Sequence, residues 1–221
     1  MTLALASALT ASASATTLVS QNWEGLITGN FSQEVVPGWF SNTAGNGTDA
    51  IEIQGQNLFD VFTIDGTHYA EVANNQAGYI FTTFTADNSS ATFSFDHGQR
   101  GASVESLDFA IVEIVGTFDD IVQTDSEFDA SGDDNVVFDF RFSTNGNSVQ
   151  DTLATGTNEF TTNTGSFATT AGTEYALVFS TTAPGALGNF IDNVVVESVP
   201  EPTSTALLGL GGLAFLIRRK R

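Results

Sequence analysis

Ala91-Thr92-Phe93-Ser94-Phe95-Asp96 is the stretch of the chain that decides the fold class. Apolar and polar residues alternate along it, so an extended backbone places all the apolar side chains on one face. The same alternation recurs within residues 136–143 and 174–180. Period-two alternation is typical of strands that bury one face, and we therefore predict that the core is built from strands.

Two further segments, residues 107–115 and 190–196, are more continuously apolar and are typical of central strands. Polar turn clusters separate the segments, among them residues 42–48 and Asn145-Gly146-Asn147. Many strands joined by polar turns favour an all-β antiparallel sandwich, most simply a jelly roll. The predicted core comprises Phe93, Phe95, Phe109, Phe138, Phe140, Phe142, Leu177, Phe179 and Val194.

The charge of the chain is strongly negative. Four of its six basic residues lie in the last four positions, so residues 1–217 contain two basic residues against 26 acidic ones, a net charge of −24. Such a charge repels nucleic acid and anionic membrane surfaces and attracts divalent cations. Because the chain has no cysteine, disulfides, thiolate zinc sites and a cysteine nucleophile are excluded.

Both ends of the chain have the composition of targeting segments. Residues 1–15 are apolar and close with Ala13-Ser14-Ala15, an A-x-A cleavage pattern, so we expect a signal peptide and a mature protein that starts near Thr16. This segment has no Lys or Arg at its start, so either it is truncated and the true start lies upstream, or it is a weak secretion signal. At the other end, Pro200-Glu201-Pro202 precedes an apolar run of 12 residues, 206–217, and then four basic residues. A membrane anchor is the alternative interpretation, but a bilayer-spanning helix needs about 20 residues.

The C-terminal order of triplet, apolar run and basic end resembles the PEP-CTERM sorting tail of exported bacterial proteins. The resemblance implies export, transient arrest in the inner membrane by a helix over residues 203–217, recognition by an exosortase, cleavage near the triplet, and delivery to the cell envelope or outside. The expected organisation is thus a signal peptide at 1–15, a jelly-roll domain at 16–199 and a sorting segment at 200–221.

The body of the chain resembles exported jelly-roll domains of the galactose-binding-like type, akin to a plant cell-wall domain family of unknown function. The matching segments are residues 29–31, 36–39, 50–53, 65–74, 94–101 and 189–196. The resemblance implies a binding module, in many relatives one for carbohydrate. It also implies a structural calcium where the first and last strands meet, with Glu24 and Asp192 as ligands.

Three other groups are candidates for a site. Asp96-His97-Gly98-Gln99-Arg100 places an imidazole and a guanidinium together, where Arg100 can bind a sugar hydroxyl pair or a carboxylate, or can close a polar network at a strand end. Asp125, Glu127 and Asp129 alternate like the first ligands of a calcium loop, although the later positions do not match. Trp39 follows Pro37-Gly38 and is either a platform for sugar or a core residue.

Two classes of function remain. We expect a non-catalytic surface or extracellular-matrix protein that can bind polysaccharide. The alternative is an extracellular glycan-processing enzyme, because a pair of carboxylates suffices for glycoside hydrolysis. A concave face with two carboxylates and aromatic platforms would favour the enzyme, and a flat, threonine-rich face would favour the binding protein.

Overall fold

The computed structural model describes residues 14–41, 50–55, 58, 61–62, 66–72, 78–99, 106–114, 136–143, 158–181 and 189–201. These residues form strands and contain no α-helix. The strands are β1 (Thr17–Gln21), β2 (Phe31–Val35), β3 (Trp39–Ser41), β4 (Ala50–Gly55), β5 (Val61–Phe62), β6 (His68–Glu71), β7 (Gly78–Thr85), β8 (Ser90–Gln99), β9 (Ser106–Glu113), β10 (Val136–Ser143), β11 (Asn158–Glu159), β12 (Thr161–Ala168), β13 (Glu174–Thr181) and β14 (Asn189–Ser198).

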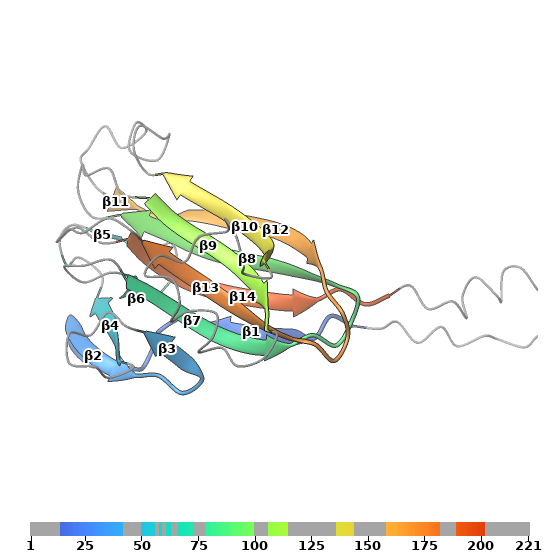
Figure 1. Ribbon diagram of the computed structural model, residues 1–221. Coiled ribbons are helices and arrows are strands. Elements are labelled where there is room, and N and C mark those ends of the chain that lie inside the picture. The colour runs from blue at the N-terminus through green and yellow to red at the C-terminus, as the bar shows by residue number, and fades with distance from the viewer. Residues whose placement is uncertain are drawn as a thin grey trace, which may run out of the picture.

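Two antiparallel sheets form the layers of a sandwich (Figure 1). The seven-stranded sheet has the order β12-β8-β14-β6-β4-β2, and β1 also pairs with β14. The five-stranded sheet has the order β10-β9-β13-β7-β3. The prediction of an all-β jelly-roll sandwich is therefore confirmed. Among the described strands, the one exception to the antiparallel pattern is a short parallel pair formed by β5 and β11.

Phenylalanine side chains join the two sheets. Phe93 and Phe95 of β8 both pack against Phe109 of β9, with ring centroids 4.8 and 4.9 Å apart, and Phe95 also meets Phe179 of β13 at 5.0 Å. The alternation in the sequence places these rings on the inner faces, because successive side chains of a strand point to opposite sides. Burial of these rings is a large part of what holds the sandwich together.

The predicted core is confirmed wherever its side chains are described. Six of its members are at most 6% exposed: Phe93, Phe95, Phe109, Leu177, Phe179 and Val194. Residues 138, 140 and 142 lie in β10, in register with Ile111, Phe109 and Leu107 of β9. Their side chains are outside the described part of the structure.

The two ends of the described chain lie side by side. Thr17 of β1 is the register partner of Glu197 of β14, and the backbone N–H of Ser198 donates to the carbonyl of Thr16 at 2.9 Å. The predicted signal peptide and C-terminal helix lie almost entirely outside the described residues. Within the described ranges, no helix is long and apolar enough to cross a membrane.

Candidate functional site

Trp39 lies in the core. Its side chain is 5% exposed, and its ring meets that of Trp23 edge-on with centroids 5.0 Å apart. The next residue, Phe40, points to the opposite side of the five-stranded sheet, where it stacks on Phe81 at 4.9 Å and is 38% exposed. Trp39 is thus a core residue and not an exposed platform for sugar. The ring exposed on the outer side of this strand is that of Phe40.

His97 faces the interior at one end of the sandwich. It is buried, and its Nε2 lies 3.0 Å from Oδ1 of Asn189 on β14. Burial lowers the pKa of His97 to about 4, although the hydrogen bond to Asn189 works in the opposite direction. A neutral, buried imidazole closes a polar network at the strand end. Its predicted partner Arg100 lies outside the described residues.

The carboxylate of Glu24 is held by the turn that precedes β6. Oε1 accepts from the backbone N–H groups of Thr67 and His68, and Oε2 accepts from Oγ1 of Thr67 at 3.0 Å and lies 3.1 Å from Nδ1 of His68. Gly66 has a φ of +78°, and a Cβ there would collide with this carboxylate. Burial raises the pKa of Glu24, but the hydrogen bonds together outweigh it and lower the pKa to about 2.

Asp192 lies on the outer face of the seven-stranded sheet, at an irregularity in β14. It is 1% exposed and is the register partner of Asp96 on β8. The next residue, Asn193, has a φ of +48°, and its backbone N–H donates to Oδ1 of Asp192 at 2.7 Å. The side chain of Asn193 donates to Oδ2 of Asp96 at 2.8 Å, and Thr162 donates to Oδ1 of Asp96 at 2.6 Å. Sequence reasoning singled out Asp192 but missed this bulge.

The calcium site at Glu24 and Asp192 stays a prediction. Both carboxylates already accept hydrogen bonds from nearby residues. No group of three or more His, Cys, Asp and Glu side chains that could hold a metal ion occurs within the described ranges. Residues 125, 127 and 129, the second candidate, lie outside them.

A buried acidic pair was missed by the sequence reasoning. Glu52 of β4 and Glu71 of β6 are register partners, 5% and 3% exposed, and the side-chain amide of Gln54 donates to both carboxylates. In the sequence, Glu52 appears only as a charged residue inside an apolar segment. Its proximity to Glu71 depends on the register between β4 and β6, which the sequence does not show. Because both carboxylates are buried, a polymeric substrate cannot reach them.

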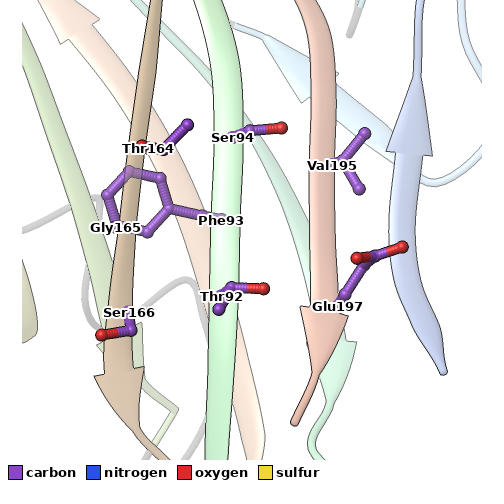
Figure 2. A pocket seen from close by; sticks show the side chains of 8 residues that line it. All are labelled: Thr92, Phe93, Ser94, Thr164, Gly165, Ser166, Val195 and Glu197. Atoms are coloured by element: carbon purple, nitrogen blue, oxygen red, sulfur yellow. The ribbon is translucent and has the colours of Figure 1, made fainter. Parts of the chain in front are cut away.

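A shallow groove of about 410 Å³ lies over β12, β8 and β14 on the outer face of the seven-stranded sheet (Figure 2). The strand register arranges its side chains in two rows. One row is Thr164, Ser94 and Val195, and the other is Ser166, Thr92 and Glu197.

Each row continues onto β1, where Ser20 pairs with Val195 and Thr17 pairs with Glu197. Both of these β1 residues are exposed, as are Thr164, Ser166 and Glu197. Neighbouring strands are about 4.8 Å apart, so a chain that lies across them meets a new side chain at each step.

Half of the residues that line this groove carry a hydroxyl group. Figure 2 shows the side chains of Thr92, Ser94, Thr164 and Ser166 on adjacent strands, with the carboxylate of Glu197 beside them. Each hydroxyl can both donate and accept hydrogen bonds, which matches the hydroxyl groups of a sugar. The groove carries one carboxylate among its described lining residues, whereas glycoside hydrolysis requires two.

The C-terminal segment begins where the sheet ends, just after β14. The backbone N–H of Val199 still donates to Ser90 at 2.8 Å, whereas Pro200 has no N–H to donate and Glu201 is exposed. Residues 198–221 match the PEP-CTERM protein-sorting motif. The motif marks proteins that are exported and sorted to the cell envelope or the extracellular space, so the predicted localisation is confirmed.

Solved structures that are similar to this chain in shape come from proteins of different kinds. A cyclase from Fischerella sp. TAU aligns with 86% of this chain and 100% of its own, at 15% identity and a TM-score of 0.54. The CBM22-1 xylan-binding domain from Paenibacillus barcinonensis aligns with 87% of this chain and 100% of its own, at 11% identity and a TM-score of 0.49. The K3 adhesin domain of Lys-gingipain from Porphyromonas gingivalis aligns with 84% of this chain and 100% of its own, at 14% identity and a TM-score of 0.43.

No curated protein sequence matches the chain significantly. The similarity to the cyclase shows the fold alone, and one fold commonly carries several functions. The groove and the sorting motif are therefore the features of this chain that bear on its function.

Proposed function

We propose that this protein is a non-catalytic surface or extracellular-matrix protein that binds polysaccharide through the groove over β12, β8 and β14. The observation that carries the proposal is the pair of hydroxyl rows, which presents exposed and half-buried donors and acceptors on the outer face of the seven-stranded sheet. Neutral glycans are bound by such groups without any change in protonation.

The alternative of a glycan-processing enzyme is less well supported. Glycosidases place two carboxylates on either side of the scissile bond, about 5–10 Å apart and in contact with substrate. Among the described residues, the paired carboxylates of Glu52 and Glu71 are buried, and the groove has only Glu197. The described groove therefore supports binding better than hydrolysis.

The binding proposal is tested with the purified full-length protein on an array of glycans, followed by titration of the best one. Replacing Thr164 by Val and Ser94 by Ala removes two hydroxyls from one row. Each hydrogen bond contributes about 0.5–1.5 kcal/mol, so the double variant should bind roughly tenfold more weakly. Thr161→Val on the same strand lies outside the groove and should bind like the wild type.

Two results would contradict this proposal. Unchanged affinity of the double variant would place the glycan elsewhere on the molecule. Release of reducing ends from the bound glycan would favour the enzyme instead.

We further propose that an exosortase recognises Pro200-Glu201-Pro202 and releases the domain from the membrane. The motif match and the exposure of Glu201 at the end of the sheet support this step. A chain that lacks residues 200–221 should fold and be exported but should no longer be retained at the envelope. Unfolding of the shortened chain would show that the tail is structural.

A further inference from the structure

Glu197 is the charged group of the hydroxyl-lined groove. It is exposed on β14, in the row that also contains Thr92 and Ser166. Among the described residues, no side chain donates a hydrogen bond to its carboxylate and none forms an ion pair with it. Its oxygens are therefore available to a ligand that lies along this row.

The charge of the groove selects between classes of glycan. Its remaining polar side chains are neutral hydroxyls, and Figure 2 shows no nitrogen atom among the side chains that line it. A glycan with carboxylate or sulfate groups would therefore bring its negative charge beside Glu197 with no cationic side chain of the groove to offset it. The net charge of −24 over residues 1–217 adds to the repulsion.

A glycan with free amino groups is positively charged and is therefore attracted to the groove. Its ammonium groups can donate charge-assisted hydrogen bonds to the Glu197 carboxylate while its hydroxyls bond to Thr92 and Ser166. Because the groove is shallow and open, solvent screens this attraction, and the gain in affinity is modest.

We propose that the groove prefers glycans built from hexosamine units with free amino groups, and that Glu197 determines this preference. The inference rests on the proposed function, since it assigns the ligand class of the same groove. The inference goes beyond the proposed function because it names one residue that discriminates between cationic, neutral and anionic sugars.

The test compares three soluble oligosaccharides of equal length: glucosamine oligomers, N-acetylglucosamine oligomers and uronic acid oligomers. Calorimetric titration of the full-length protein at pH 6 and low salt should give the tightest binding to the glucosamine oligomer and the weakest to the uronate. Glu197→Gln should weaken binding of the glucosamine oligomer about two- to fivefold and should weaken binding of the N-acetylglucosamine oligomer by a smaller factor.

A negatively charged protein attracts any polycation, so a matched control is needed. Glu174→Gln removes the same charge from an exposed position on β13 of the other sheet. If this variant weakens binding of the glucosamine oligomer as much as Glu197→Gln does, the preference comes from net charge and the inference is wrong.

The two proposals fail in different ways. Equal binding of the glucosamine and N-acetylglucosamine oligomers by the wild type would overturn the role of Glu197 and leave the glycan groove in place. Absence of binding to all three oligomers and to every glycan on the array would overturn both.

Discussion

Glu24 and His68 are joined by two hydrogen bonds although 44 residues separate them in the chain. The carboxylate accepts from the backbone N–H of His68 at 2.8 Å and lies 3.1 Å from its ring Nδ1. The contact ties the segment after β1 to the start of β6, at the turn that Gly66 makes possible with its positive φ.

This contact predicts a stability that depends on acid pH. The pKa of Glu24 is lowered from 4.5 to about 2, so its contribution is fully present above pH 4.5 and is lost as the pH falls to about 2. Glu24→Gln should lower the free energy of unfolding by about 1 kcal/mol at pH 7, a value reduced for the partial exposure of the group, and by almost nothing at pH 2. Urea denaturation of both proteins measures this, and an equal difference at both pH values would contradict it.

The buried imidazole of His97 predicts a second, separate pH range. Its pKa is lowered from 6.5 to about 4, so the unfolded chain binds the proton more tightly and stability falls as the pH drops from 6.5 to 4. At about 1.4 kcal/mol per pKa unit, the loss over this range is about 3 kcal/mol. His97→Gln, which retains an amide donor for Asn189, should show a flatter profile between these two pH values, whatever its stability at pH 7.

Trp39 and Phe40 should respond differently to truncation. Trp39→Ala removes a ring that is 5% exposed and contacts Trp23. It should lower the free energy of unfolding, measured by urea denaturation, by about 3–5 kcal/mol. Phe40→Ala removes a ring that is 38% exposed and should cost clearly less. A Trp39→Ala protein that keeps its stability but loses glycan binding would instead restore the role of this ring as a sugar platform.

Gly165 marks a close approach between β12 and the core. A Cβ at this position would lie 2.6 Å from two ring atoms of Phe93, which is itself packed against Phe109. Gly165→Ala should therefore destabilise the protein by about 1–3 kcal/mol. Gly29→Ala is the matched control, because a Cβ there meets nothing within 4 Å and its φ is not positive. Equal thermal stability of the two variants would show that β12 shifts freely.

Calcium binding at Glu24 and Asp192 leads to a thermal test. If the ion binds the folded state alone, a hundredfold excess over Kd stabilises it by about 2.7 kcal/mol, and the Tm should rise with calcium and fall with chelator. Asp192→Asn should remove most of this rise. A full rise in that variant, together with its loss on neutralising Asp125, Glu127 and Asp129, would place the ion in the acidic segment.

Much of the fold could be predicted because its signals are local. The alternation of residues 91–96 identifies a strand and its buried face, and the burial of Phe93 and Phe95 confirms it. The sorting tail is also local, since triplet, apolar run and basic end are contiguous. Alternation further places Trp39 and Phe40 on opposite faces, but it does not say which face is inner, because both are large aromatic residues.

The sequence by itself thus determined the strand class, the phenylalanine core, the acidic body and the C-terminal address, each of which depends on neighbours along the chain. Only the tertiary structure decided that Gln54 joins Glu52 to Glu71. It also decided which side chains of four separate strands share one outer face as two rows: Thr17 and Ser20, Thr92 and Ser94, Thr164 and Ser166, and Val195 and Glu197. These arrangements depend on strand order and register between distant segments. A shift of one residue in any pairing would turn those side chains to the other face, so no local pattern can specify them.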